Sequence, residues 1–224
     1  MNHLDLIKRG TAAYVFALTA LGISLQSPKL AGKDGTLATC LILLIYELYE
    51  PTSNLNTAHE GHMAGIERLV QFRGVEQNET ALGGALFKNI TYALMVKSLQ
   101  YRKTSRLKEL IDQTVWWDMQ GILFAKGHRL GNLLEDLDTY KTSAQHSLQA
   151  SAGYLQLCAG LDMEFGSWYQ DLLAESPSPI YWTSGNEPEL LFPNINLALL
   201  LLDYWALRLA LSTSIDIICS NVPD

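Results

Sequence analysis

The feature that most constrains the fold of this sequence is the spacing of its apolar residues, which recur three and four positions apart in segment after segment. No stretch shows sustained alternation of apolar and polar residues, the pattern of a half-buried strand. Because spacing by three and four places side chains on one face of an α-helix, the sequence predicts an all-α protein. Its 224 residues, 48% of them hydrophobic, can bury one good core, as a large single domain or as two closely packed ones. We expect a single domain over residues 1–224 with about eight helices.

Signals for helix starts and stops divide the first third of the chain. Asp34 is a natural N-cap, so a helix is expected from Asp34 to the proline after Glu50. Thr57 and Glu60 have the S/T-x-x-E spacing of a capping box, which predicts a helix that starts there. Gly74 is a plausible C-cap for that helix.

The remaining helices are expected from apolar periodicity alone. The pattern predicts helices over residues 82–94, 107–119 and 133–158, and a short one over 165–172. Residues 175–194 contain four prolines and a glycine, which forbid a continuous helix there. The apolar run from Ile195 is interrupted by Asp203 and Arg208, so it is expected to be a buried core helix and not a membrane span.

The N-terminal segment allows two interpretations. Lys8 and Arg9 precede a long apolar run, as in a secretory signal peptide. However, Asp5 interrupts the basic region, no clean cleavage site follows, and the apolar residues keep helical spacing. We therefore expect a buried helix that ends near Leu25.

Charge and cysteine content narrow the function classes. The net charge of -7 and the pI near 5.2 lack the basic excess that drives binding to nucleic acid. The only stretch rich in basic residues, 97–108, is interpreted as a solvated helix end. Cys40, Cys158 and Cys219 are odd in number and far apart, which favours free thiols in a reducing compartment. Glycosylation sequons at Asn78 and Asn89 argue weakly for secretion.

The sequence His59-Glu60-Gly61-His62 invites comparison with the zinc-protease motif H-E-x-x-H. That motif needs histidines at i and i+4, which lie one above the other on a helix, whereas His59 and His62 are three residues apart. No third ligand is nominated by the sequence. We therefore interpret the segment as an ordinary helix start and predict no metal site.

Two further sets of residues have the composition of a ligand site, one for Mg²⁺ and one for a small molecule. Glu135 and Asp138 are one helical turn apart, the spacing by which carboxylates hold Mg²⁺, but no second acidic box follows, so a solvated helix face is favoured. The tryptophans could line a small-molecule pocket but are expected to be core; they are Trp116, Trp117, Trp168, Trp182 and Trp205. No nucleophile elbow or phosphate-binding loop occurs. The sequence thus names no catalytic residue and implies no cofactor.

One family resemblance emerges from residues 16–74. The segment resembles the opening half of the fungal-specific transcription factor domain, the helical regulatory region of fungal binuclear zinc-cluster regulators. In that family a D-x-T-L helix ends in Tyr-Glu and is followed by a helix with the pattern H-x-x-G-x-x-x-L-x-x-x-R-G. The matching positions are Asp34, Thr36, Leu37, Tyr46, Glu47, His62, Gly65, Leu69, Arg73 and Gly74. The likeness continues more loosely through residues 86–107 and the last helix.

The resemblance implies a regulator of fungal genes, including those of secondary metabolism, that acts in the nucleus through protein partners or a small-molecule effector. Family members typically carry a C-x2-C-x6-C zinc cluster, which three isolated cysteines cannot build. The chain is then either the regulatory part of a longer protein or a short form that pairs with itself or with a full-length regulator. No direct nucleic-acid or membrane contact is expected. The alternatives are a small helical enzyme or binding protein for an apolar molecule, and a secreted helical protein.

Overall fold

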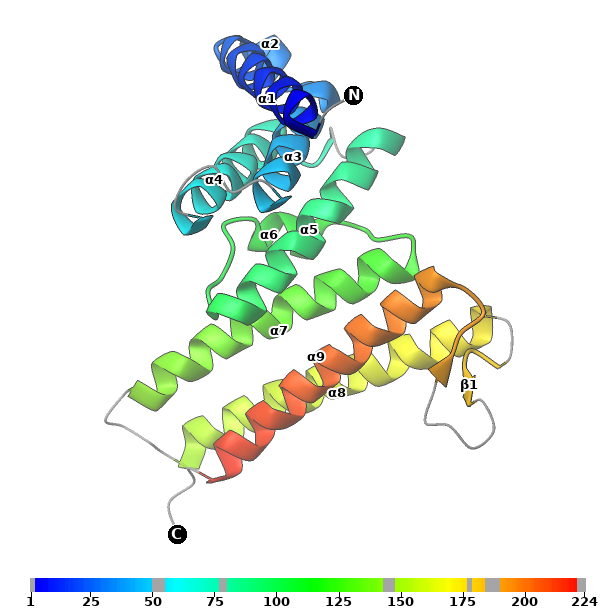
Figure 1. Ribbon diagram of the computed structural model, residues 1–224. Helices are drawn as coiled ribbons and strands as arrows, with labels where there is room; N and C mark the ends of the chain where they lie inside the picture. The colour runs from blue at the N-terminus through cyan, green and yellow to red at the C-terminus, as the bar shows by residue number, and fades with distance from the viewer. Residues whose placement is uncertain are drawn as a thin grey trace. The chain divides into compact units, whose positions relative to one another are not determined.

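The structure is a computed structural model that describes residues 3–49, 55–76, 80–142, 148–176, 179–183 and 190–220. In these ranges it contains nine α-helices and two strands of two residues each, so the predicted all-α class is confirmed (Figure 1). The helices are α1 (His3–Leu25), α2 (Pro28–Ala31), α3 (Asp34–Tyr49), α4 (Leu55–Arg73), α5 (Ala81–Tyr101), α6 (Lys108–Gln113), α7 (Met119–Thr142), α8 (Leu148–Glu175) and α9 (Ile195–Ser220).

The chain folds into two compact units, Met1–Ile90 and Thr91–Asp224, here called unit 1 and unit 2. The boundary between them falls inside α5. The sequence-based expectation of one domain over 1–224 stays a prediction.

Unit 1 is organised around the pair of helices α3 and α4, with α1 packed on α3. Leu37 of α3 is fully buried, and Met63, Ile66 and Val70 of α4 are at most 2% exposed. The spacing of these three residues along α4, three and then four, is what brings them onto one face. The apolar stripe that predicted this helix is therefore the stripe it buries.

Asp34 and Arg73 join the start of α3 to the end of α4. The Arg73 guanidinium forms an ion pair with the Asp34 carboxylate and donates a hydrogen bond to the carbonyl oxygen of Gly32, at 2.9 Å. The second carboxylate oxygen of Asp34 accepts a bond from the Thr80 hydroxyl, at 3.1 Å. Asp34 is the first residue of α3 and not its N-cap. Its carboxylate contacts Arg73 and Thr80, which lie far from it in the sequence.

The ends of α4 test the predicted caps. The helix begins at Leu55, two residues before the predicted start, so Thr57 lies inside the helix and is not its N-cap. At the other end, Gly74 has φ +71°, a left-handed conformation that glycine adopts without steric cost. The predicted C-cap is confirmed.

The expectation that the N-terminal helix is buried is wrong. α1 ends at Leu25 as predicted, yet among its described side chains only Leu21 is classed as buried, and Phe16 is 75% exposed. One of its contacts is the stacking of Tyr14 on Tyr46 of α3, with 4.7 Å between ring centroids. Spacing by three and four reports helix formation, but it does not report which neighbour is present to cover the apolar face.

Unit 2 is built on three long helices, α7, α8 and α9, each packed against the other two. Its core includes Phe165 and Trp168 of α8 and Leu201 and Leu207 of α9, all at most 1% exposed. The Trp168 indole N–H is satisfied by the carbonyl oxygen of Met119, at 2.8 Å. These contacts tie the middle of α8 to both of its neighbours.

The predicted helix boundaries in unit 2 are wrong in two places. The expected helix over 107–119 is interrupted, because α6 ends at Gln113 and α7 begins at Met119, with Thr114 in an extended conformation. The expected helix over 133–158 divides between α7 and α8, and the expected short helix over 165–172 is the continuation of α8. Residues 143–147 of the predicted helix lie outside the described residues.

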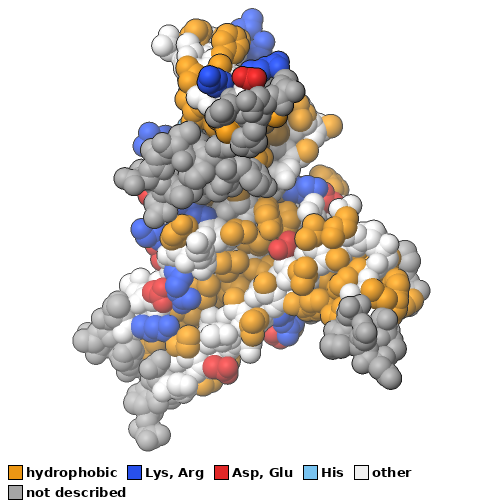
Figure 2. Space-filling view, in the orientation of Figure 1, with side chains coloured by type: hydrophobic (Ala, Val, Ile, Leu, Met, Phe, Trp, Pro, Cys, Tyr) orange, Lys and Arg blue, Asp and Glu red, His pale blue; other side chains and the backbone are white. Residues whose placement is uncertain are grey.

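The C-terminal helix α9 is partly buried, with one face in the core and one face exposed. Leu201 and Leu211 are at most 1% exposed, while Leu199, Leu202 and Leu209 on the other face are 53%, 53% and 69% exposed. Figure 2 shows apolar side chains gathered over the face that α7 and α9 present in this view. By length and composition alone, Asp5–Leu25 and Ile195–Ser220 could each cross a membrane, a test that core helices also pass.

The proline-rich segment before α9 forms a short antiparallel strand pair, β1 (Trp182–Thr183) with β2 (Leu190–Leu191). The apolar residues of segment 175–194 predict that it packs against the helices, and this expectation is confirmed in part. Ile180 is 5% exposed, whereas the four strand residues remain exposed. Tyr181 and Phe192 contact Trp205 of α9, with ring centroids 5.7 and 6.2 Å from it.

Candidate functional site

Within the described residues, no three His, Cys, Asp or Glu side chains lie together in a way that could hold a metal ion. His59, Glu60 and His62 all fall within α4, where Glu60 is exposed and His62 half-buried. The side chain of His59 lies outside the described residues. The expectation that this segment belongs to a helix is confirmed. The expectation that it binds no metal stays a prediction.

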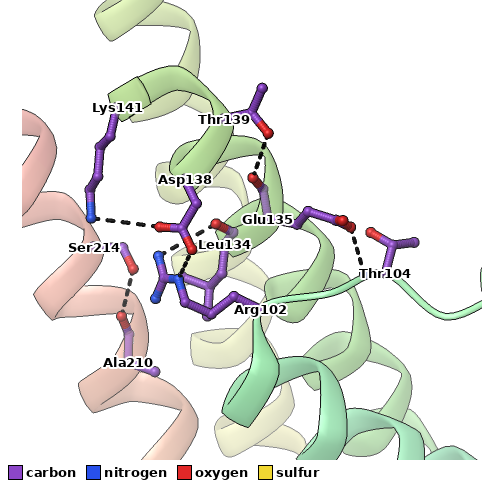
Figure 3. Close-up of polar contacts among 9 residues, drawn as sticks. All are labelled: Arg102, Thr104, Leu134, Glu135, Asp138, Thr139, Lys141, Ala210 and Ser214. Atoms are coloured by element: carbon purple, nitrogen blue, oxygen red, sulfur yellow. Dashed lines mark hydrogen bonds and ion pairs between the residues drawn. The ribbon is translucent and has the colours of Figure 1, made fainter. Parts of the chain in front are cut away.

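Glu135 and Asp138, the acidic pair of α7, are held by groups next to the end of α5 (Figure 3). A carboxylate oxygen of Glu135 accepts a hydrogen bond from the backbone N–H of Thr104, at 2.6 Å. Hydrogen bonding by Thr104, through its side chain first and its backbone N–H second, lowers the pKa of the carboxyl. Asp138 forms ion pairs with Arg102 and, at 3.8 Å, with Lys141. Both carboxylates therefore fasten the segment after α5 onto α7.

Arg102 itself has φ +52°, a conformation that is uncommon for a residue with a side chain. Its guanidinium reaches both the Asp138 carboxylate and the carbonyl oxygen of Leu134, the latter at 3.4 Å. These bonds to α7 offset the cost of the left-handed backbone at the end of α5. The basic stretch 97–108 thus supplies a tertiary contact as well as solvated charges.

The tryptophans do not converge on one pocket. Trp168 is core, Trp117 is 90% exposed, and Trp182 is 43% exposed. Trp116 donates a 3.4 Å hydrogen bond to the carbonyl oxygen of Ile111 and lines a cavity of about 420 Å³ between α6 and α7. Trp205 belongs to the aromatic cluster with Tyr181. The expectation that they are simply core is confirmed for Trp168 and is wrong for Trp117 and Trp182, which are exposed.

The three cysteines differ in burial: Cys158 is buried, Cys40 is half-buried and Cys219 is exposed. Burial raises the pKa of Cys40 to about 11, and burial followed by the charge of nearby Cys219 raises the pKa of Cys158. All three cysteines are free. Because the thiolate is the reactive form, the raised pKa values disfavour a nucleophilic role for Cys40 and Cys158.

A groove of about 560 Å³ lies between α6, α7 and α8 of unit 2. Its volume lies within the range of ligand sites, about 300–1,000 Å³. Its polar lining residues are Lys108 and Asp112 of α6, Arg129, Asn132 and Asp136 of α7, and Gln156 and Glu164 of α8.

The two long walls of the groove are antiparallel helices. At one end Arg129 of α7 binds Glu164 of α8 through both guanidinium nitrogens, and Lys126 reaches the same carboxylate at 3.0 Å. At the other end the Tyr154 hydroxyl of α8 donates to the carbonyl oxygen of Asp136, at 3.4 Å. Partial burial alone would raise the pKa of the Glu164 carboxyl, but Lys126 and Arg129 lower it below its usual value. The groove is therefore framed by fixed contacts at both ends.

A buried polar pair lies beneath the groove. Asn132 is 6% exposed and His128 is fully buried, with the Asn132 amide nitrogen 3.5 Å from His128 Nδ1. Among the described residues, neither Asn132 Oδ1 nor His128 Nε2 has a hydrogen-bond partner. Burial, with a smaller effect of the Lys108 ammonium, lowers the pKa of His128 to about 4. Unpaired buried polar atoms cost about 1–3 kcal/mol each, so this pair marks a site under local strain.

Sequence reasoning did not nominate the groove residues. Arg129, Asn132 and Asp136 recur at three and four positions along α7, so they share one helix face, which a search for polar periodicity would have found. Their convergence with α6 and α8 depends on helix packing, which the sequence does not encode locally.

Comparison with protein-family models, with curated proteins and with solved structures found no match to this chain.

Proposed function

We propose that this chain is a helical regulatory module of a fungal transcription regulator, and that it works in the nucleus through contacts with protein partners. In this proposal it has no reaction of its own to catalyse and makes no contact with DNA or with a membrane. Its partner is a second copy or a full-length zinc-cluster regulator, and the genes it controls include those of secondary metabolism.

One observation supports this proposal most directly. Asp34, Arg73 and Gly74, three of the positions on which the family resemblance rests, have linked structural roles in unit 1. Asp34 and Arg73 connect α3 to α4, and Gly74 ends α4. A motif whose residues serve the scaffold in this way is the kind that a non-catalytic domain would share with its relatives.

The charges of the chain give further support. A net charge of -7 disfavours binding to DNA phosphates. Glu135 and Asp138, the carboxylates that a magnesium-dependent enzyme would use, are engaged by Thr104, Arg102 and Lys141. The enzyme alternative therefore has less support than the regulatory module.

The test is to fuse the chain to a heterologous DNA-binding module in a fungal host and to measure a reporter gene downstream of that module's binding site. We expect the fusion to change transcription relative to the DNA-binding module alone. Asp34→Ala, which disrupts unit 1, should abolish the change, and Lys103→Gln, a substitution of an exposed residue, should preserve it. No change in transcription with a folded, nuclear fusion would contradict the proposal.

Partner binding is tested separately by affinity purification of the tagged chain from the same host. We expect a second copy, or a protein with the C-x2-C-x6-C cluster, to co-purify at a fixed ratio. A chain that is monomeric and purifies without any such protein would argue against action through partners.

A further inference from the structure

The groove of unit 2 has an apolar floor. Leu133 and Leu161 are 6% and 8% exposed, and Leu157 beside them is 55% exposed. Gly153 and Gly160 of α8 also line it, and a Cβ added at either glycine would meet no atom within 4 Å. The absence of side chains at these two positions leaves the groove open along α8.

The walls of the groove offer unpaired charges. Within the described ranges, Lys108, Asp112 and Asp136 have no ion-pair partner within 4 Å, whereas Arg129 and Glu164 neutralise each other. Asp112 also lines the second cavity, together with Lys126 and Arg129, whereas Lys108 and Asp136 line the groove and not that cavity. Lys108 and Asp136 are therefore the cation and the anion most available to a ligand.

The buried amide of Asn132 adds a third property that a ligand of the groove must match. Asn132 lines the groove, is nine-tenths buried, and has an unpaired Oδ1 among the described residues. A ligand with an amide group supplies both a donor and an acceptor, so it can satisfy Asn132 in either orientation of the side-chain amide.

These requirements exclude other ligand classes. A phosphate or another multiply charged anion would meet two unpaired carboxylates and a single available cation, Lys108. A wholly apolar molecule would desolvate the charged walls and leave the Asn132 amide unpaired. What remains is a compact molecule with an ammonium, a carboxylate, an amide and an apolar body.

We propose that this groove binds a short apolar peptide with free termini, of about dipeptide size. Asp136 receives its ammonium group, Lys108 receives its carboxylate, and Asn132 bonds its peptide group. Its side chains lie over Leu133, Leu157 and Leu161. The proposal rests on the groove alone and does not depend on a role in transcription.

The test is isothermal titration calorimetry of the full chain with leucyl-leucine. We expect saturable binding with one site per chain. Two analogues separate the contributions of the charges: N-acetyl-leucyl-leucine lacks the ammonium and leucyl-leucine amide lacks the carboxylate. Each should bind about tenfold or more weakly, because a charge-assisted hydrogen bond is lost.

Substitutions locate the site. Asp136→Asn and Lys108→Gln should each weaken leucyl-leucine binding by about tenfold or more. The matched controls Asp171→Asn and Lys103→Gln make the same chemical changes at exposed positions of unit 2 outside the groove, and should leave binding unchanged. Asp136 and Lys108 are exposed as well, so their variants should keep the circular dichroism spectrum of the parent chain.

Three results would overturn the proposal. The first is no heat of binding at millimolar leucyl-leucine. The second is binding of the acetylated and amidated analogues as tight as that of the free dipeptide. The third is retention of full affinity by the folded Asp136→Asn and Lys108→Gln variants, which would show that leucyl-leucine binds elsewhere.

Discussion

Arg73 is completely buried at its side chain, whereas Asp34, its ion-pair partner, keeps 26% of its side chain exposed. Removal of Asp34 and removal of Arg73 should therefore have different effects on stability. Without Arg73 the Asp34 carboxylate can be hydrated, whereas without Asp34 the Arg73 guanidinium stays in the interior and has lost its carboxylate partner.

This asymmetry predicts the effects of two substitutions. Asp34→Ala should lower the free energy of unfolding by about 3 kcal/mol, because it removes the carboxylate that pairs with the buried Arg73 guanidinium. Arg73→Met should cost less, since methionine fills the volume of the arginine stem and Asp34 remains in contact with water. Urea denaturation followed by circular dichroism measures both. Equal losses, or a larger loss for Arg73→Met, would contradict this account.

Close packing of α5 on α7 within unit 2 predicts a contrast between two glycines. A Cβ at Gly131 would lie 2.0 Å from the hydroxyl oxygen and 2.6 Å from the Cβ of Ser98, whereas a Cβ at Gly166 would meet nothing within 4 Å. Gly131→Ala should therefore destabilise the fold by about 1–3 kcal/mol. Gly166→Ala, the same change in an open position of α8, should stabilise it by about 0.5–1 kcal/mol. Similar melting temperatures for the two variants would refute the close approach.

The buried His128 predicts a loss of stability in mild acid. Its folded pKa of about 4 lies below the unfolded value near 6.5, so the unfolded chain binds more protons between these two pH values. The contribution of the neutral imidazole is fully present above about pH 6.5 and is lost as the pH falls toward about 4, by about 3 kcal/mol in all. Free energies of unfolding at several pH values measure this loss. His128→Gln should reduce the dependence; an unchanged dependence would show that other groups cause it.

The ion pairs of Asp138 predict that magnesium has no effect on stability. Arg102 and Lys141 already occupy this carboxylate, and the Thr104 N–H occupies that of Glu135. Added MgCl₂ should therefore leave the melting temperature unchanged relative to the same ionic strength of NaCl. Asp138→Asn should cost at most about 1 kcal/mol, because the pair is partly exposed. A rise in melting temperature that Asp138→Asn removes would restore the metal-site hypothesis.

Exposure of α1 predicts that a large apolar residue there can be replaced at little cost. Phe16→Ser removes a side chain that is 75% exposed, so the free energy of unfolding should change by no more than about 0.5 kcal/mol. Leu37→Ser is the contrasting change at a fully buried position of α3 and should be severely destabilising. A large loss of stability for Phe16→Ser would mean that this face is covered in solution.

The sequence predicted the helices best where polar and apolar signals coincide. Leu25, Asp34 and Gly74 mark helix ends within a residue of their predicted places, because proline, aspartate and glycine act on the local backbone. The break between α6 and α7 at Thr114 contains no proline or glycine, so the apolar periodicity wrongly predicted one continuous helix across it. The length of α8 was missed for a similar reason, since nothing local marks Cys158 as mid-helix.

Burial and site geometry were less accessible to sequence reasoning. Periodicity identified the apolar faces of α1 and α9, but whether a face is covered depends on elements distant in sequence, as Phe16 and Leu209 show. The groove was missed because Lys108 and Asp136 each look like ordinary solvated charges within their own helix. Only the packing of α6, α7 and α8 brings them to one cavity.

The distribution of aromatic residues gives each unit its own optical signal. All five tryptophans occur after residue 115, hence in unit 2, whereas unit 1 has tyrosines such as Tyr14 and Tyr46. Emission excited selectively at tryptophan therefore follows unit 2 alone, while far-ultraviolet dichroism follows the helices of both units. Overlaid denaturation curves from the two signals would report whether unit 1 and unit 2 unfold together or one after the other.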